Sequence, residues 1–306
     1  MVASNQVCFK LLRQLFILID VVAPGVSIWS ARAGIPFCTT DALTQKSGTS
    51  MSTPSVAGTA ALVREYFLQN NKERLLKYEL FNKSPTQTLS GTLVKATIIH
   101  SAEGMKGNVS LDKSQTVWAD LSTKSLPNIY TGFGRVNIGN VFLFDQIDAS
   151  FGKLFTINRY ELEPNSKVTA QFKTNSKTIV KATMAYYDKK GTLTTKDTSN
   201  MKQLINDLDL IITTNSSSNT FYGNSNLSGN RGKDAVNNVE RITLDEVDED
   251  TFLSIQISAK KTNVGAQNFS LVVTGDLQFL ALNQGNFLKV AHMVVCLIST
   301  FLLVLL

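Results

Sequence analysis

The sequence predicts an α/β region, then an all-β antiparallel sandwich, then a C-terminal transmembrane helix, along 306 residues. Between residues 20 and 148, strand-like and helix-like apolar segments alternate, which is typical of an α/β domain. After residue 150 the chain changes to short β-branched runs separated by polar turns, the pattern of a sandwich. Residues 290–306 contain no Asp, Glu, Lys or Arg, and their length and apolarity predict a membrane span.

The composition excludes several classes of protein. The net charge of +6 is modest and the lysines are scattered, so we expect no nucleic-acid partner. Cys8, Cys38 and Cys296 are too few and too irregularly spaced for a zinc site or a disulfide framework. One Cys8–Cys38 bridge is possible, and free thiols are the alternative.

Residues 1–19 are left unassigned. Lys10 and Arg13 interrupt their apolar stretch, and the remaining run is too short for the core of a signal peptide. We expect a short strand or helix here, with a weak signal peptide as the alternative.

A glycine-serine-proline order marks the start of a helix near residue 50. Gly48 permits a backbone conformation closed to other residues, and Pro54 suits the first turn of a helix. Small residues follow on successive turns, which predicts a helix that other elements enclose. A serine at such an N-terminus lies beside free N–H groups and a positive dipole end, which suits an oxyanion. The alternative is a Gly/Ser turn that caps an ordinary buried helix.

Residues 46–63 resemble the nucleophile segment of the subtilisin family of serine proteases (peptidase S8, subtilases). The resemblance rests on Gly48-Thr-Ser-Met-Ser, Pro54 and Val56-Ala-Gly, and it extends to 20–30 and 132–136. It places Ser50 on the catalytic serine. It implies a hydrolase that cuts peptide or protein substrates through an acyl-enzyme, with no cofactor needed for the chemistry. Residues 132–136 resemble the turn that opens the last helix of the catalytic domain.

The other two triad groups are not found by the same comparison. In subtilisins the triad runs Asp, His, Ser along the chain, and here the serine already stands at position 50. The two histidines, His100 and His292, lie outside the family's histidine motif. We expect His100 to end a helix over 93–100, with an improvised base as the alternative. Asp20 matches the residue that heads a strand, not the triad aspartate, so we expect the chain to be inactive alone.

Seven β-branched runs make up the predicted sandwich: 154–160, 167–172, 179–187, 205–213, 238–244, 252–259 and 268–274. Their order resembles the jelly-roll domain that follows the catalytic domain in one alkaline subgroup of subtilisins. The shared signatures are 206–210, 237–240 and 265–271.

Asp207 and Asp209 form a candidate calcium site. Alternate residues of a strand share a face, so both carboxylates point the same way. Asn237, Asn238 and Glu240 are the candidates to complete an all-oxygen shell, since comparable jelly-roll domains bind calcium. The alternative is a solvated acidic strand edge.

The predicted domains are an unassigned 1–19, a truncated catalytic domain 20–148, an independent sandwich 149–276, a linker 277–289 and a membrane segment 290–306. A buried helix or a cleaved lipid-anchor signal is the alternative for the last segment. The first functional hypothesis is a catalytically incomplete, membrane-attached serine endopeptidase at the cell surface or in the secretory pathway. The second is a non-catalytic binding or display module with a protease remnant. A genuine short protein and a truncated gene model remain equally open.

Overall fold

The computed structural model describes residues 19–33, 42–81, 88–110, 118–121, 125–143, 152–191, 204–215, 219–225 and 232–286. The predictions for 1–18, for all three cysteines, for His292 and for the segment 290–306 therefore lie outside the described residues. In the part that is described, no helix combines the length and apolarity needed to cross a bilayer.

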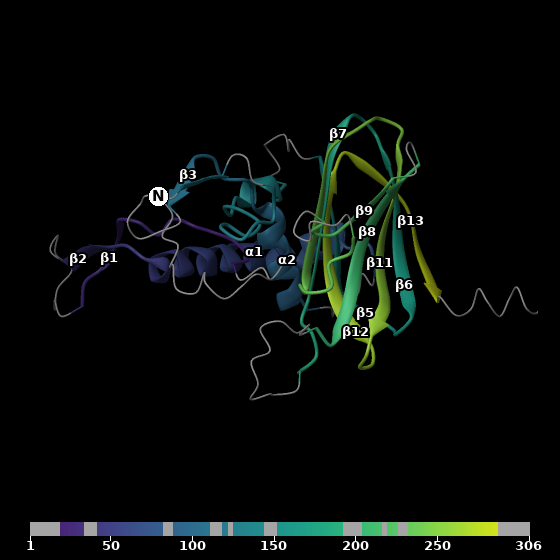
Figure 1. Cartoon of the computed structure of the whole chain (residues 1–306), viewed down its shortest axis with the longest axis horizontal. Coiled ribbons are helices and arrows are strands. Elements are labelled where there is room, and N and C mark those ends of the chain that lie inside the picture. Colours follow the sequence, from purple (N-terminus) through teal and green to yellow (C-terminus); the bar gives the residue numbers. More distant parts are fainter. Residues whose placement is uncertain are drawn as a thin grey trace, which may run out of the picture.

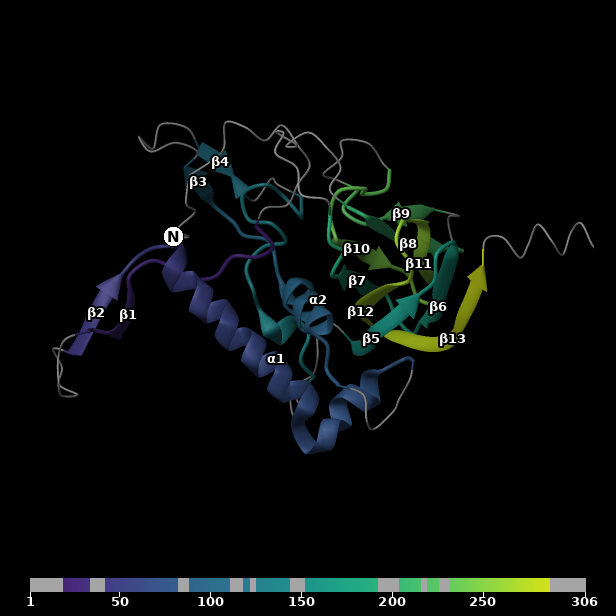
Figure 2. The ribbon, with the colours of Figure 1, turned by 90° about the horizontal axis from the view of Figure 1, so that it is seen from below.

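The larger part of the molecule is a sandwich of two antiparallel sheets (Figures 1 and 2). One sheet has the order β10-β7-β12-β5 and the other β13-β6-β11-β8-β9. The strands are β5 Lys153–Leu162, β6 Ser166–Thr174, β7 Thr178–Tyr186, β8 Asn206–Thr214, β9 Thr220–Tyr222, β10 Val239–Val247, β11 Phe252–Thr262, β12 Gln267–Gly275 and β13 Leu277–Asn286. All seven predicted runs are confirmed as strands.

The predicted linker 277–289 is wrong over most of its length. Strand β13 pairs with β6 along the edge of the five-stranded sheet. Leu277 is fully buried and Phe279 packs against the core, whereas Gln278 and Leu280 are exposed. The polar residues that follow on the exposed face hide this short alternation in the sequence.

The sandwich core lies between the two sheets. From β8 it receives Leu208, Leu210 and Ile212, and from the other strands the alternate residues that face inward. Because the side-chain period of a strand is two, the residues between these leucines in β8 point away from the core.

The smaller part holds two helices, α1 Thr49–Tyr78 and α2 Gly91–Ser101. Helix α1 begins where predicted, and Leu75 and Tyr78 near its end continue the buried face begun by Tyr66 and Phe67. The small part also has two hairpin ladders and one 3₁₀ turn: β1 Ile28–Ala31 with β2 Leu43–Lys46, β3 Asn108–Ser110 with β4 Trp118–Asp120, and η3 Ile138–Asn140.

The predicted α/β alternation over 20–148 is only partly found. Instead of a strand ending near residue 23, the described chain has an isolated parallel bridge between Val22 and Arg135. The turn at 132–136 supplies Arg135 to this bridge. It also lies close to the chain before Val22, since an added Cβ at Gly132 would lie 1.8 Å from the carbonyl oxygen of Ile19. The turn leads into η3 rather than into a described α-helix.

The two parts share a second hydrophobic cluster. It joins α1 and α2 residues such as Phe67 and Leu93 to the outer face of the four-stranded sheet, including Leu154 and Val272. In Figure 2, α2 lies between α1 and this sheet. The sandwich is therefore packed against the two helices.

Candidate functional site

Ser50 is the second residue of α1, at the helix start that the sequence predicts, and its side chain is exposed. The turn before it is held by two backbone hydrogen bonds: Gly48 N–H donates to Gly25 O at 2.7 Å, and Met51 N–H donates to Gly48 O at 3.0 Å. Gly48 has φ 155°, and an added Cβ at Gly25 would lie 2.8 Å from Gly48 O. Both glycines are needed for this close approach.

The surroundings of Ser50 suit an oxyanion better than a proton acceptor. The first N–H groups of a helix have no intrahelical partner, and the dipole of α1 is positive at this end. Pro54 lies in the second turn, so it cannot donate to the carbonyl of Ser50. Among the described residues, the Ser50 hydroxyl has no hydrogen-bond partner, and no base activates it.

The helix that carries Ser50 is poorly covered over its first half. Ala57, Gly58 and Ala61 are exposed, and Leu62 is 49% exposed. An added Cβ at Gly58 would meet nothing within 4 Å. Within the described residues, the enclosure that the small side chains predict is therefore absent.

A cavity of about 510 Å³ lies between α1 and α2. It is lined mainly by apolar side chains such as Val56, Val94 and Ile98, and Ser50 is not among its lining residues. Asp20 at its rim forms an ion pair with Lys95 at 3.1 Å, so this carboxylate neutralises a lysine rather than orienting a histidine.

His100 is at the C-terminal end of α2, as predicted, but it is fully buried against the sheet. Its Nδ1 lies 3.0 Å from Thr183 Oγ1 and its Nε2 lies 2.8 Å from Thr274 Oγ1. Burial, and then the charges of Lys181 and Arg241, lower the pKa of His100 well below its usual value. Both ring nitrogens are occupied, so in this structure His100 cannot be the base for Ser50.

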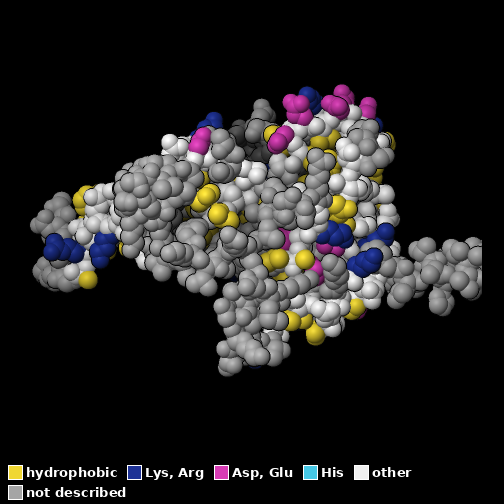
Figure 3. Space-filling view, viewed as in Figure 1, with side chains coloured by type: hydrophobic (Ala, Val, Ile, Leu, Met, Phe, Trp, Pro, Cys, Tyr) yellow, Lys and Arg dark blue, Asp and Glu magenta, His cyan; other side chains and the backbone are white. Residues whose placement is uncertain are grey.

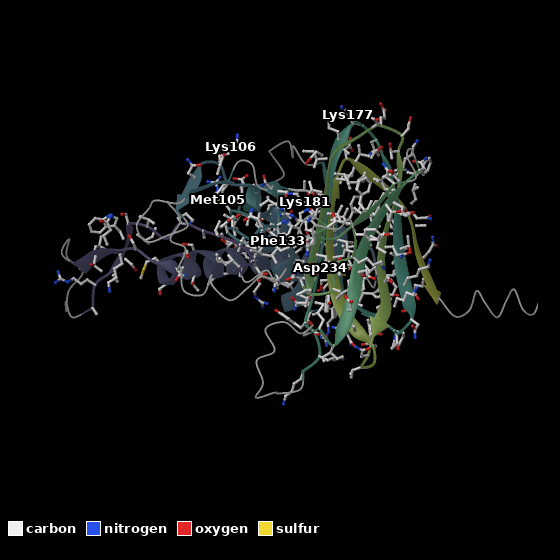
Figure 4. All side chains as sticks on the ribbon, in the orientation of Figure 1. Met105, Lys106, Phe133, Lys177, Lys181 and Asp234 are labelled. Atoms are coloured by element: carbon white, nitrogen blue, oxygen red, sulfur yellow. The ribbon has the colours of Figure 1, made fainter. Side chains whose placement is uncertain are left out.

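Two cations from the sandwich cap the C-terminal end of α2. Arg241 donates to the carbonyls of Ile99 and Ala102, both at 3.1 Å, and Lys181 donates to the carbonyl of His100 at 3.2 Å. Burial lowers the pKa of Lys181 to about 8 and that of Arg241 to about 10. Figure 4 shows Lys181 and Phe133 where the helical part meets the sandwich, and Arg241 lies 5.0 Å from the centre of the Phe133 ring.

Three of the five predicted calcium ligands are buried carboxylates on β8 and β10. Asp207, Asp209 and Glu240 are each at most 2% exposed, so the alternative of a solvated acidic edge is wrong. Glu240 Oε2 accepts a hydrogen bond from Leu210 N–H at 2.7 Å, which ties β10 to β8. Burial first, and then the charges of Asp234, Asp209 and Asp207, raise the pKa of Glu240 well above its usual value.

The amide nitrogens of the other two predicted ligands, Asn237 and Asn238, donate hydrogen bonds to their neighbours. The Nδ2 of Asn237 donates to Asp234 at 2.7 Å, and that of Asn238 donates to the carbonyl of Tyr186 at 2.9 Å. The sequence analysis missed Lys233, whose Nζ forms an ion pair with Asp209 Oδ2 at 2.6 Å. Over the described ranges, no group of three or more His, Cys, Asp or Glu side chains is arranged to hold a metal ion.

A second group of acidic side chains is exposed, unlike the buried carboxylates of Asp207, Asp209 and Glu240. In Figure 3, Asp and Glu side chains gather at the end of the sandwich where Figure 4 labels Lys177. Glu246 pairs with Lys177 and Asp250 pairs with Lys173, and both carboxylates are more than 70% exposed. Such solvated pairs contribute little to stability and do not form a site.

Comparison with known proteins gives two matches. Residues 4–134, which include Ser50, match the model of the subtilase family (peptidase S8). Over 302 aligned residues the chain is 26% identical to the serine protease/ABC transporter B family protein tagD of Dictyostelium discoideum. The alignment covers 84% of this chain and 16% of that relative, so the chain spans about a sixth of its length. The motif at Ser50, the geometry of its helix and the family match agree: residues 4–134 are similar to the subtilase family of serine proteases.

Proposed function

We propose that this chain supplies the nucleophile segment of a subtilisin-like serine endopeptidase, with Ser50 as the residue that attacks the peptide carbonyl. The position of Ser50 carries the proposal: it lies exposed at the N-terminus of α1, after a turn that Gly25 and Gly48 make possible. In this reaction Ser50 Oγ bonds to the carbonyl carbon, its proton passes to a general base, and the amine departs with a proton. The backbone N–H at the start of α1 would stabilise the oxyanion.

We propose further that the chain alone does not carry out this reaction. A serine hydroxyl is a weak nucleophile until an oriented base takes its proton. Within the described residues the one histidine is held by Thr183 and Thr274, and Asp20 is paired with Lys95. Neither group is therefore placed to take the proton of Ser50 in the part of the chain that the structure describes.

Labelling of the purified chain with a fluorophosphonate probe tests both statements. We expect no labelling above that of Ser50→Ala. In subtilisin, the known example, loss of the catalytic histidine costs about 10⁶ in turnover. Labelling at Ser50 on addition of a polypeptide with the aspartate and histidine motifs would support the proposed role. Stoichiometric labelling of Ser50 without it would show that the chain contains a base.

We propose calcium as a ligand of the buried carboxylates of Asp207, Asp209 and Glu240. The donor chemistry fits, because calcium prefers carboxylate oxygens. Among the described residues, Glu240 Oε1 is buried without a hydrogen-bond partner. Gly223 leaves room for the carboxylate, since an added Cβ there would lie 2.2 Å from Glu240 Oε2. An ion would stabilise the sandwich, and its effect should appear as a melting temperature that rises with calcium concentration.

The remaining proposals concern the whole protein. We propose that the sandwich is of the jelly-roll type and that residues 290–306 attach the chain to a membrane at the cell surface or in the secretory pathway. A non-catalytic binding or display module is the second candidate function. It is favoured by one observation, the contrast between the buried sandwich core and the exposed first half of α1. A chain that stays unlabelled even with the added polypeptide would favour this second candidate.

A further inference from the structure

We propose that the hairpin of β1 and β2 binds the surface of an anionic lipid bilayer, with Trp29 and Leu43 inserted at the level of the headgroups. The function proposed above leaves this hairpin without a role. Its contact with lipid is separate from membrane attachment through residues 290–306, because a different segment of the chain makes it.

The hairpin projects from the rest of the molecule. In Figures 1 and 2, which are views at right angles, β1 and β2 extend beyond the start of α1 on the side away from the sandwich. The two strands pair antiparallel in a regular register. Trp29 is 64% exposed and Leu43 is 52% exposed, so two large apolar side chains of this hairpin face solvent.

One face of the hairpin is apolar. Alternate residues of a strand share a face, and the register places Trp29 opposite Gln45 and Ala31 opposite Leu43. These four residues therefore lie on the same side. The amide nitrogen of Gln45 donates to the carbonyl of Ser27 at 3.2 Å. The rest of this face is formed by Trp29, Ala31 and Leu43.

The opposite face carries positive charge. Lys46 pairs with Ile28, and the N–H of Arg32 extends the same ladder by donating to the carbonyl of Ala42 at 2.7 Å. Lys46 and Arg32 are both exposed, and the ladder contains no Asp or Glu. Figure 3 shows Lys and Arg side chains beside apolar ones at this end of the molecule. A tryptophan-containing apolar face backed by cations has the chemistry of a segment that lies in the membrane interface.

The small size of the apolar face favours a bilayer over a protein partner. A stable protein interface buries about 800 Å² on each partner, whereas one large aromatic side chain contributes about 150 to 250 Å². Trp29, Leu43 and the small Ala31 fall well short of that area. A bilayer needs no complementary surface. The indole would lie at the level of the headgroups, and anionic lipids would attract Arg32 and Lys46.

Quenching by brominated lipids tests the contact on the full-length chain. Trp29 and Trp118 are its two tryptophans, so Trp118→Phe leaves Trp29 as the reporter and Trp29→Phe leaves Trp118 as the matched control. We expect vesicles of brominated phosphatidylcholine and phosphatidylserine to lower the Trp29 emission at least about twofold, since an indole at the headgroup level reaches the lipid chains. The Trp118 emission should stay unchanged.

Removal of the two cations tests the contribution of charge. In the Trp118→Phe chain, Arg32→Gln together with Lys46→Gln should require about ten to thirty times more lipid for half-maximal quenching. Lys190→Gln, which removes an exposed lysine outside the hairpin, should stay within about twofold of the parent chain. Urea unfolding of each variant verifies that it is folded.

An unquenched Trp29 in a folded chain would overturn the contact, even if the chain floats with the vesicles. That result would leave attachment through residues 290–306 standing. Equal quenching of Trp29 and Trp118 would also overturn it, as would equal quenching of Trp29 by vesicles of brominated phosphatidylcholine alone. A blue shift of the Trp29 emission without lipid, growing with protein concentration, would overturn it in favour of a second copy of the chain on the hairpin.

Discussion

Ser50 and His100 lie on neighbouring helices whose surroundings are opposite. Ser50 stands exposed at the start of α1, where Ala57 and Gly58 also face open space. His100 stands at the end of α2 with both ring nitrogens bonded and no exposed surface. The residue with the clearest sequence motif is thus exposed, whereas a residue without a motif is buried with both ring nitrogens hydrogen-bonded.

The difference shows what each motif encodes. The nucleophile motif encodes a turn and a helix start, which glycine, serine and proline can specify locally. The contact between the end of α2 and the four-stranded sheet, called the junction below, is formed by residues far apart in sequence, on α2, β7, β10 and β12. Its polar groups are bonded because an unsatisfied buried donor or acceptor is costly. We therefore expect the junction to control folding and the Ser50 end to tolerate change.

The largest effect is expected at Arg241. Replacement by Met removes the Arg241 Nη1 hydrogen bonds to the carbonyls of Ile99 and Ala102, and Ile99 O keeps only its bond from Ala102 N–H. We expect the free energy of unfolding to fall by about 3 kcal/mol, measured by urea denaturation. Lys190→Met, an exposed control, should change it by less than about 0.5 kcal/mol. An equally small change for Arg241→Met would mean that α2 is not held by the sandwich.

His100→Leu should have the next largest effect, and it should depend on pH. Thr183 and Thr274 would lose their partner, at a cost of about 2 kcal/mol at pH 7.5. The pKa of His100 is lowered in the folded state, so below pH 6.5 the unfolded chain binds a proton that the folded chain does not.

The stability of the wild type should therefore decline by up to about 1.4 kcal/mol per pH unit more steeply than that of His100→Leu as the pH falls below about 6. The difference between the two unfolding curves at pH 7.5, 6.5 and 5.5 isolates this contribution from the other titrating groups. Parallel curves would show that His100 is protonated as easily in the fold as in the unfolded chain.

The sequence predicts the features that neighbouring residues specify, and it does not predict those that depend on residues far apart in the chain. The seven predicted strands are found because their alternation is local, as is the helix start at Ser50. Strand β13 was missed because Gln278, Asn283 and Gln284 make it read as a linker. The pairing of Lys233 with Asp209 joins residues 24 positions apart, and no local pattern predicts it. Asn237 and Asn238 are expected to bind calcium through their side-chain oxygens, and the bonds described above for them are made by Nδ2, to Asp234 and to the Tyr186 carbonyl.

A smaller effect is expected at Gly25, beside the nucleophile turn. An added methyl group would lie 2.8 Å from Gly48 O and 3.2 Å from Ser52 Cβ, so the turn must shift. We expect Gly25→Ala to lower the free energy of unfolding by about 1.5 kcal/mol. Loss of probe labelling at Ser50, under conditions where the wild type is labelled, would place the shift at the nucleophile. Unchanged stability would mean that the turn is looser than its distances indicate.

The smallest effect, with the opposite sign, is expected at Gly58. It lies inside α1, where glycine costs backbone entropy, and an added Cβ meets nothing within 4 Å. Gly58→Ala should therefore raise the free energy of unfolding by about 0.5 to 1 kcal/mol, measured in urea beside the wild type and Gly25→Ala. The two substitutions add the same methyl group within one part of the molecule, and only their surroundings differ. A loss of stability at Gly58 would show that another surface packs on the first half of α1, and the contrast between the exposed Ser50 helix and the buried junction would then fail.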